Sequence, residues 1–174
     1  MSDYYGHAAI QFIYENLPGA FKKPAAGKTG LAILNAVAMA GIAYSNAPAG
    51  IVTTAGRIIA DDTGLPAGIC MGIILPHALE YKLAKKEKFR GELLLALGGL
   101  DVYATTPESE MPAKALSLVR ELSAACAKVL PRGLREFQIP PYKLKDYAVQ
   151  AAAASARVKT DDCLRVLEAA WQGR

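Results

Sequence analysis

Histidine, cysteine and glycine-rich loops are scarce in this sequence, and each scarcity limits the chemistry that the chain can perform. The 174 residues hold two histidines, His7 and His77, and neither lies near a serine or cysteine in a nucleophile motif, so no catalytic triad can be assigned. The three cysteines are widely spaced and form no CxxC pair, which argues against a disulfide framework. This sparse count, together with an N-terminus that lacks a basic and apolar leader, predicts a cytoplasmic location.

Phosphate-binding loops are also missing. No glycine-rich dinucleotide fingerprint is present. Gly27-Lys28-Thr29 matches the last three residues of a phosphate-binding loop, but that motif requires a glycine five residues before Gly27, where Lys22 stands. We therefore expect no nucleotide cofactor bound by this chain alone.

Charge is modest and unevenly placed. The net charge is +4, and much of it gathers in the run KLAKKEKFR over residues 82–90. No aromatic platform interleaves with these lysines, so we interpret the run as a solvated helix end that complements the helix dipole, with a nucleic-acid patch as the weaker alternative. Residues 29–56 carry no charge at all. Asn35, Asn46 and Pro48 interrupt this stretch, and alanine and glycine dominate it, which predicts a buried helix hairpin rather than a membrane span.

The periodicity of the apolar residues predicts an all-α helical bundle, organised as a single domain over residues 1–174. Hydrophobic residues make up 52% of the chain, enough for a core, and few segments alternate with the period of two that a strand requires. We expect 31–44 to be a central helix that is buried on all sides, and 101–111 to be a loop. The other expected helices cover residues 2–17 (ended by Pro18-Gly19), 48–60, 65–84, 89–98, 112–129, 142–156 and a last one capped by 160–162.

Four blocks of sequence, taken in order, resemble the C-terminal helical domain of the iron-containing (group III) alcohol dehydrogenases, relatives of dehydroquinate synthase and glycerol dehydrogenase. The blocks are SDYYGHAAIQFIYENLP, AVAMAGIAYSNAPAGIV, GLPAGICMGIILPHALEY and KTDDCLRVLEAAW. The resemblance extends over nearly the whole chain, and its middle two blocks are the most specific. It implies a helical domain that holds a divalent metal, iron or zinc. It also implies a separate N-terminal Rossmann-like domain for NAD(P), with the alcohol reacting in the cleft between the two domains.

The metal ligands of that family do not carry over to this sequence. Two family histidines, four residues apart on one helix, fall on Thr53 and Arg57, and the histidine of a Pro-His-Gly motif falls on Ala67. A hydroxyl is a poor ligand for such a metal, and a guanidinium repels a divalent cation. His77 matches a family residue that is not normally a ligand, so we interpret it as a helix-packing or surface histidine, beside a possible vestigial pocket. We therefore expect no catalytic, cofactor-binding or metal-binding residue.

The remaining family ligands are an aspartate and a histidine four residues apart on an earlier helix. Asp3 and His7 have this spacing. In register, however, they fit the helix directly before the Glu-Asn-Leu-Pro block, whereas the family's Asp-His helix lies further upstream. We do not assign this pair as metal ligands.

Two functions stay open on these grounds. The first is a non-catalytic descendant of the metal-binding domain that acts as a binding or interaction module. The second is a subunit of a split NAD(P)-dependent alcohol or aldehyde oxidoreductase, completed by a separate Rossmann-type chain, in which Arg57 holds an anionic substrate.

We also expect a homo-oligomer, most simply a two-fold dimer, and no nucleic-acid or membrane partner. The loss of a partner domain would leave an apolar cleft face partly open, and another subunit would then cover it. The residues expected on this face are Ala47, Ile51, Val52, Ala55 and Ile58.

Overall fold

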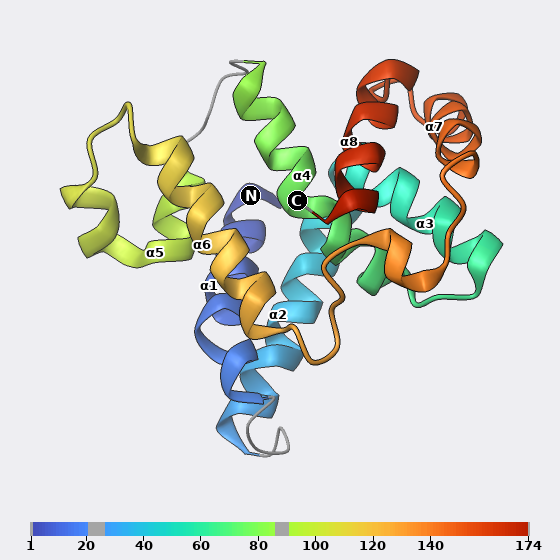
Figure 1. Ribbon diagram of the computed structural model, residues 1–174. Coiled ribbons are helices and arrows are strands. Elements are labelled where there is room, and N and C mark those ends of the chain that lie inside the picture. Colours follow the sequence, from blue (N-terminus) through green and yellow to red (C-terminus); the bar gives the residue numbers. More distant parts are fainter. Residues whose placement is uncertain (1, 21–26, 86–90, 174) are drawn as a thin grey trace. The chain divides into compact units, whose positions relative to one another are not determined.

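The computed structural model describes residues 2–20, 27–85 and 91–173, and within them it contains helices and turns but no strand (Figure 1). The predicted all-α class is confirmed. The chain groups into two compact units, each assembled from two separate stretches. Unit 1 takes residues 1–48 and 88–126, and unit 2 takes residues 49–87 and 127–174. The single domain over residues 1–174 stays a prediction.

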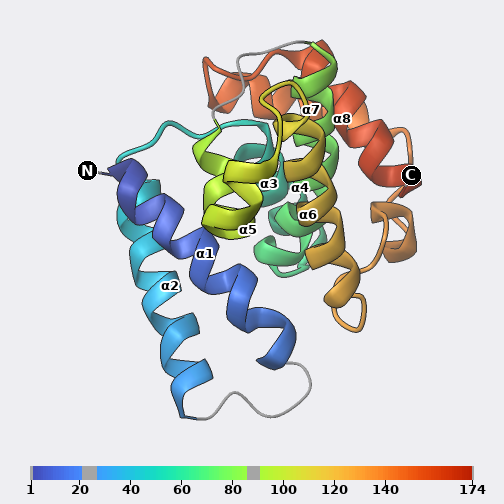
Figure 2. The same ribbon diagram turned by 90° about the vertical axis from the view of Figure 1, so that its left-hand side faces the viewer.

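Unit 1 is organised around its first helix. α1 (Ser2–Ala20) packs against α2 (Lys28–Ser45), α5 (Glu92–Thr105) and α6 (Met111–Ala125), and α5 also packs against α6. Figure 2 shows α1 and α2 lying side by side. Small residues allow this close approach, since a Cβ atom added to Gly6 would lie 3.6 Å from the Cβ of Ala43. The helix expected over 31–44 starts earlier, at Lys28, and α1 continues through Pro18 to Ala20.

The prediction that α2 is buried on all sides is wrong. Ala36 is its one buried residue, and several of its large apolar side chains are exposed. The sequence is apolar around the whole helix, but α1 covers only one side of it. Apolar composition indicates that a helix has surface to bury and does not specify how many neighbours the fold supplies.

α5 differs from the expected helix followed by a loop. The helix expected over 89–98 does break at this end, because Gly99 has φ of 75° and ψ of −179°. The backbone then resumes a helical course to Thr105, so residues 101–105 are helical rather than loop. A left-handed φ of this kind favours glycine, which explains why the break falls there.

Unit 2 contains two helix pairs and a short 3-10 helix. α3 (Ile51–Thr63) packs against α4 (Ala67–Ala84) and α7 (Lys143–Ala154), and α8 (Thr160–Gln172) packs against α4, α7 and η1 (Leu134–Phe137). Its core is continuous across these elements. The largest fully buried side chains there are Ile59, Ile74, Leu134, Leu167, Val166, Cys70 and Cys163.

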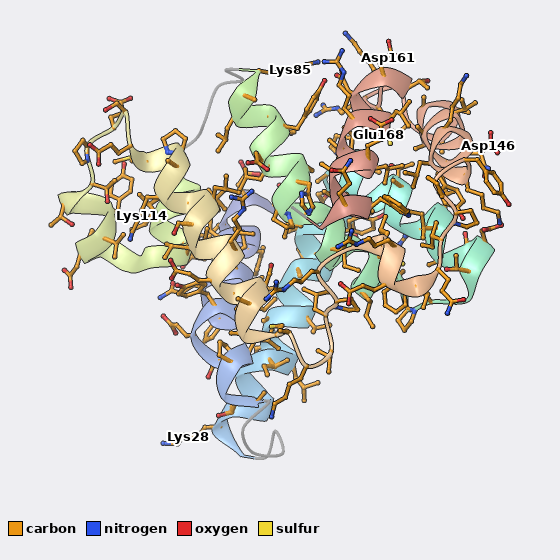
Figure 3. The ribbon with its side chains drawn as sticks, in the orientation of Figure 1. Lys28, Lys85, Lys114, Asp146, Asp161 and Glu168 are labelled. Atoms are coloured by element: carbon orange, nitrogen blue, oxygen red, sulfur yellow. The ribbon has the colours of Figure 1, made fainter. Side chains whose placement is uncertain are left out.

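The ends of several helices shift from their predicted positions. α3 begins at Ile51 rather than at Pro48, and α6 ends at Ala125 rather than at 129. Much of the basic run over residues 82–90 lies outside the described residues, although Lys82 does fall in the last turn of α4. Figure 3 shows other charged side chains, such as Lys28 and Asp161, pointing away from their helices. Among the described helices, none has the length and hydropathy needed to cross a membrane.

Candidate functional site

The α3–α4 hairpin carries Thr53, Arg57 and Ala67, the three positions that the resemblance in sequence matched to metal ligands. α3 begins at the Gly50 cap, whose carbonyl oxygen accepts a hydrogen bond from the Thr54 hydroxyl at 2.9 Å. It ends at Gly64, which adopts a left-handed φ of 72° and donates its N–H to the carbonyl of Ala60 at 2.8 Å. Pro66 then leads directly into α4. The three-residue turn therefore returns α4 alongside α3.

A glycine sets how closely the two helices pack. A Cβ atom added to Gly56 would lie 2.6 Å from the Cγ of Met71 and 3.2 Å from its backbone nitrogen. This contact sets which residues of α3 lie beside which residues of α4. The two helices run antiparallel from it. Ala67 thus lies toward the Thr63 end of α3, and residues after Met71 lie toward the Gly50 end.

The residues at the ligand positions do not fit an iron or zinc site. Thr53 is half-buried and Arg57 is exposed one turn later on α3, while Ala67 is the first residue of α4 and packs against the core of unit 2. Together they offer a hydroxyl, a guanidinium and a methyl group, where such metals require imidazole, thiolate or carboxylate. Across the described ranges, no group of three or more His, Cys, Asp or Glu side chains could hold a metal ion.

His77 belongs to a different part of α4. Its side chain is only 6% exposed, and its Nδ1 atom is shut off from solvent. It lies ten residues after Ala67, which is about 15 Å along the helix axis. The two residues therefore cannot line one metal site. The pair Asp3 and His7 lies on α1 in unit 1, where Asp3 is exposed and His7 half-buried.

Three of the five residues on the apolar face that we expected to be partly open are half-buried. Ala55 is fully buried in the core of unit 2, and Ile51, Val52 and Ile58 are half-buried against the same core. Of the expected set, only Ala47 is exposed. The residues of α3 that look available from the sequence are therefore used to pack α3 onto α4 and α7.

Two polar clusters that sequence reasoning missed link the helices of unit 2. One carboxylate oxygen of Asp62 on α3 accepts hydrogen bonds from the Tyr147 hydroxyl and the Lys143 ammonium of α7, both at 2.6 Å. These two donors hold the pKa of the Asp62 carboxyl below its ordinary value. Burial, and then the hydrogen bond to Asp62, raise the pKa of the Tyr147 hydroxyl.

The second cluster repeats this arrangement between α4 and α8. One oxygen of Asp162 accepts hydrogen bonds from the Tyr81 hydroxyl at 2.8 Å and from the Lys85 ammonium at 2.6 Å, and Lys85 also lies 4.9 Å from the centre of the Tyr81 ring. Lys85 is labelled at the end of α4 in Figure 3. Hydrogen bonds from Lys85 and then from Tyr81 lower the pKa of the Asp162 carboxyl.

Each cluster joins two helices and is not arranged for catalysis. The aspartate is held ionised and its charge is matched by a lysine, so neither is poised to transfer a proton near neutral pH. A sequence signal did exist, since the tyrosine and lysine of each cluster are four residues apart and share a helix face. The aspartate partners are 77 to 85 residues away, which sequence spacing alone cannot connect.

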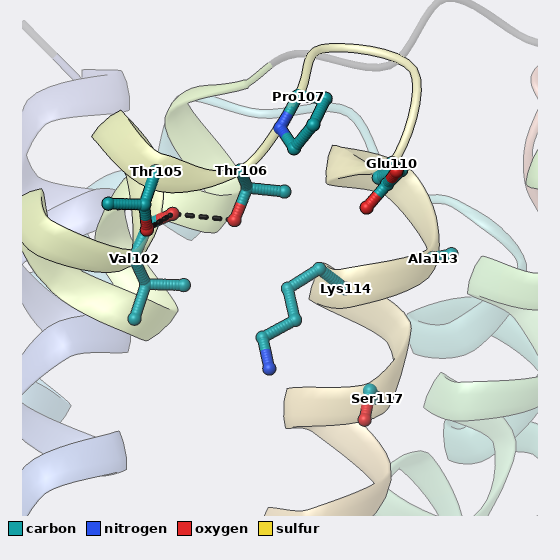
Figure 4. Close-up of a pocket in the computed structure, with 8 residues that line it drawn as sticks. All are labelled: Val102, Thr105, Thr106, Pro107, Glu110, Ala113, Lys114 and Ser117. Carbon is teal, nitrogen blue, oxygen red and sulfur yellow. Dashed lines mark hydrogen bonds between the residues drawn. The ribbon is translucent and has the colours of Figure 1, made fainter.

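Unit 1 contains an open hollow between α5 and α6, with a volume of about 620 Å3 (Figure 4). The hydroxyls of Thr105 and Thr106 donate to carbonyls of their own helix, at 2.7 and 2.6 Å, and so do not offer their protons to the hollow. Lys114 extends into it as its single cationic group. This open surface does not exclude water, so we do not assign it as a catalytic site. Its lining residues are Val102, Thr105, Thr106, Pro107, Glu110, Ala113, Lys114 and Ser117.

Residues 1–168 match the model of the Fe-containing alcohol dehydrogenase family, C-terminal. Alcohol dehydrogenase 4 of Saccharomyces cerevisiae is 29% identical over 147 residues, a match that covers 83% of this chain and 35% of the yeast protein. The chain therefore spans about a third of the length of that relative.

Solved structures show the same fold. The crystal structure of a 1,3-propanediol oxidoreductase is similar with a TM-score of 0.84 and 21% identity, over 98% of this chain and 45% of that one. An alcohol dehydrogenase from Oenococcus oeni gives a TM-score of 0.78 at 20% identity, over 97% of this chain and 45% of that one. An iron-containing alcohol dehydrogenase from Corynebacterium glutamicum gives 0.80 at 16% identity, over 99% and 46% respectively.

Proposed function

Because this chain belongs to the Fe-containing alcohol dehydrogenase family, and matches that family's C-terminal domain, we propose that it is a non-catalytic member that acts as a binding or interaction module. The observation that carries the proposal is the chemistry at Thr53, Arg57 and Ala67. None of the three can replace an imidazole, and Arg57 brings positive charge to the position where a cation would bind. At an effective dielectric constant of about 20 this repulsion amounts to several kcal/mol at close range.

The chain matches a region that makes up 35% of the yeast relative and 45% of the propanediol oxidoreductase. The described residues alone offer neither a dinucleotide loop nor a group of metal ligands.

Metal analysis of the full chain tests this proposal. The protein is expressed with added iron and, separately, with added zinc, dialysed, and assayed by elemental analysis and for NAD(P)-linked oxidation of primary alcohols. We expect far less than one metal ion per chain and no reduction of the nucleotide. One tightly held metal ion per chain would refute the proposal, whatever the activity.

The second candidate is a subunit of a split oxidoreductase. The favouring observation is that the fold agrees with that of the propanediol oxidoreductase over 98% of this chain, so a nucleotide-binding partner could meet a largely intact surface. Arg57 is exposed, and its guanidinium could hold an anionic substrate without metal. The test mixes this chain with a separately expressed N-terminal half of a relative. Co-elution with turnover of an alcohol or aldehyde would favour this candidate, and a mixture with neither would eliminate it.

A further inference from the structure

The hollow between α5 and α6 contains a lysine that no described carboxylate neutralises. Figure 4 shows Lys114 reaching from α6 toward the end of α5, where Thr105 and Thr106 form part of the wall. Glu110 lies four residues before Lys114, the usual spacing for an ion pair along a helix. Among the described residues, however, Lys114 forms no ion pair with Glu110 or with any other carboxylate. Its ammonium group is therefore available to a ligand.

The hydroxyl groups that line the same hollow act as hydrogen-bond acceptors. Thr105 and Thr106 donate their protons to carbonyls of their own helix, at 2.7 and 2.6 Å. Ser117 on α6 donates its proton to the carboxylate of Glu121 at 2.9 Å. A hydroxyl has one proton and two lone pairs, so each of these oxygens can still accept a hydrogen bond. The hollow thus combines one cationic donor, Lys114, with acceptors whose own protons are already in use.

We propose that this hollow binds a small hydroxycarboxylate, with the carboxylate on Lys114 and the hydroxyl groups directed at Thr105 and Thr106. The inference rests on the proposed role as a binding module and names its ligand. A carboxylate forms a charge-assisted hydrogen bond with an ammonium group. The ligand's hydroxyl groups donate the protons that the two threonine oxygens can accept. Both walls of the hollow belong to unit 1, so its lining is assembled within one unit.

Charge and size together select a small monoanion. Among the described lining residues Lys114 is the one cation, and Glu110 adds a negative charge to the same lining. A dianion such as a phosphate monoester would bring a second negative charge that Glu110 repels and that no described lining residue compensates. The volume of about 620 Å3 lies in the range of small-molecule sites, and Val102 and Pro107 provide an apolar wall for the carbon chain. Because the ligand gains one charged contact and few hydrogen bonds, we expect a dissociation constant on the order of 1 mM.

Titration of the full chain, followed by the backbone amide signals in an assigned NMR spectrum, tests the inference. The probe is glycerate, which has one carboxylate and two hydroxyl groups. Propionate, which has no hydroxyl group, and glycerol, which has no charge, are the matched comparison compounds. At constant ionic strength we expect glycerate to shift the signals of residues 102–117 with a dissociation constant of about 1 mM, and the other two compounds to bind at least about 10-fold more weakly.

Substitutions separate the role of the charge from that of the hydroxyl groups. Lys114→Gln should weaken glycerate binding at least about 10-fold, because it removes the charged partner of the carboxylate. Lys128→Gln makes the same charge change at an exposed lysine of unit 2 and should leave binding unchanged. Thr105→Val/Thr106→Val keeps the side-chain shape without the acceptors, so it should reduce the affinity for glycerate to that for propionate and leave propionate binding unchanged. The dispersion of the amide signals establishes that each variant is folded, and Lys114→Gln, at an exposed side chain, suffices if the valine variant is not.

Three results would overturn the inference. The first is the absence of a saturable shift over residues 102–117 with glycerate up to about 50 mM. The second is an equal effect of Lys114→Gln and Lys128→Gln, which would indicate general attraction of anions to a basic chain. The third is tighter binding of glycerol phosphate than of glycerate, which would assign the hollow to phosphate esters. Metal analysis separates this inference from the proposed function: a metal-loaded chain that binds glycerate would refute the function alone, and a metal-free chain that does not bind it would refute the ligand alone.

Discussion

The main chain at Gly133 lies directly against the main chain at Trp171. A Cβ atom added to Gly133 would stand 2.8 Å from the carbonyl oxygen of Trp171 and 3.0 Å from the backbone nitrogen of Gly173. The indole N–H of Trp171 also donates to the carbonyl oxygen of Ile139 at 2.7 Å. The segment before and after η1 is thus held on the end of α8 at two points.

Replacement of Gly133 by alanine should destabilise the protein. The backbone φ of −150° at Gly133 is available to any residue, so the effect comes from the close backbone contact and not from torsional strain. Overpacking against atoms that cannot rotate away costs about 2 to 3 kcal/mol. Urea unfolding of Gly133→Ala measures this loss.

Gly68→Ala is the control for that substitution. A Cβ atom at Gly68 meets nothing within 4 Å, and the residue is the second of α4, so alanine should not destabilise the protein. If the two variants unfold at the same urea concentration, the contact between Gly133 and Trp171 is not as close as described.

Local sequence patterns are sufficient to predict several of the helices. The spacing of apolar residues predicted the helices around residues 2–20, 67–84 and 160–172, because caps, prolines and periodicity act within a few residues. The burial of α2 was predicted wrongly. An alanine-rich apolar stretch has the same sequence pattern whether one helix or several helices cover it. Residues 101–105 were missed because Gly98-Gly99 looks like a stop, and the helix resumes after a single left-handed residue.

In the candidate site, too, local spacing could be predicted from the sequence and contacts between distant helices could not. That Thr53 and Arg57 share a helix face follows from their spacing, and α3 places them so. The Asp62 and Asp162 clusters depend on which helices pack together, information that lies in the tertiary contacts between α3 and α7 and between α4 and α8. The sequence alone therefore could not predict that each aspartate is paired with a lysine and a tyrosine.

Acid should weaken the protein through Asp62 and Asp162. Both carboxyls have folded-state pKa values below the ordinary one, with hydrogen bonds from lysine and tyrosine as the main cause. Their contribution is therefore complete above the unfolded pKa of about 4 and is lost as the pH falls through the lower folded values. We expect the free energy of unfolding to decline below about pH 4, and to decline less steeply in the variant Asp62→Asn/Asp162→Asn.

Urea unfolding from pH 7 to pH 2 measures this slope, and Asp101→Asn, at an exposed carboxylate of unit 1, is the control. The control should keep the slope of the unmodified chain. Identical slopes for the double variant and the unmodified chain would show that the two clusters do not contribute.

Histidine at both Thr53 and Arg57 should create metal binding. Thr53→His/Arg57→His places two imidazoles four residues apart on α3, on the same helix face. At a Zn2+ concentration about 100 times the dissociation constant, binding to the folded state should stabilise the variant by about 2.7 kcal/mol. Thermal unfolding with and without Zn2+ measures the shift.

The unmodified chain and Arg57→His should show no comparable shift. The single variant has the same charge as the double variant and lacks the second imidazole, so it isolates the effect of the pair. If Zn2+ stabilises the unmodified chain as strongly as the double variant, the chain has a metal site of its own and the proposed function fails.

Cys163 should be unreactive while the protein is folded. Its side chain is fully buried, and burial raises the pKa of the thiol to about 11. At pH 8 only about 0.1% of such a thiol is thiolate, the form that reacts with iodoacetamide. Mass spectrometry after labelling should find Cys163 modified in 6 M urea and unmodified in buffer, whereas a thiol introduced by Leu34→Cys should label at once. Rapid labelling of Cys163 in buffer would contradict the described core.

The interleaved composition of the two units sets an order on folding as the chain leaves the ribosome. All helices of unit 1 have been synthesised once residue 126 has emerged, whereas the α3–α4 hairpin, made much earlier, must wait for α7 and α8 at the end of the chain. During that interval the sides of α3 and α4 that pack against α7 and α8 have no helix to cover them. Neither unit can therefore be expressed as one uninterrupted fragment, and a nascent chain that stalls after α6 would carry an exposed half-core, the kind of surface that chaperones bind.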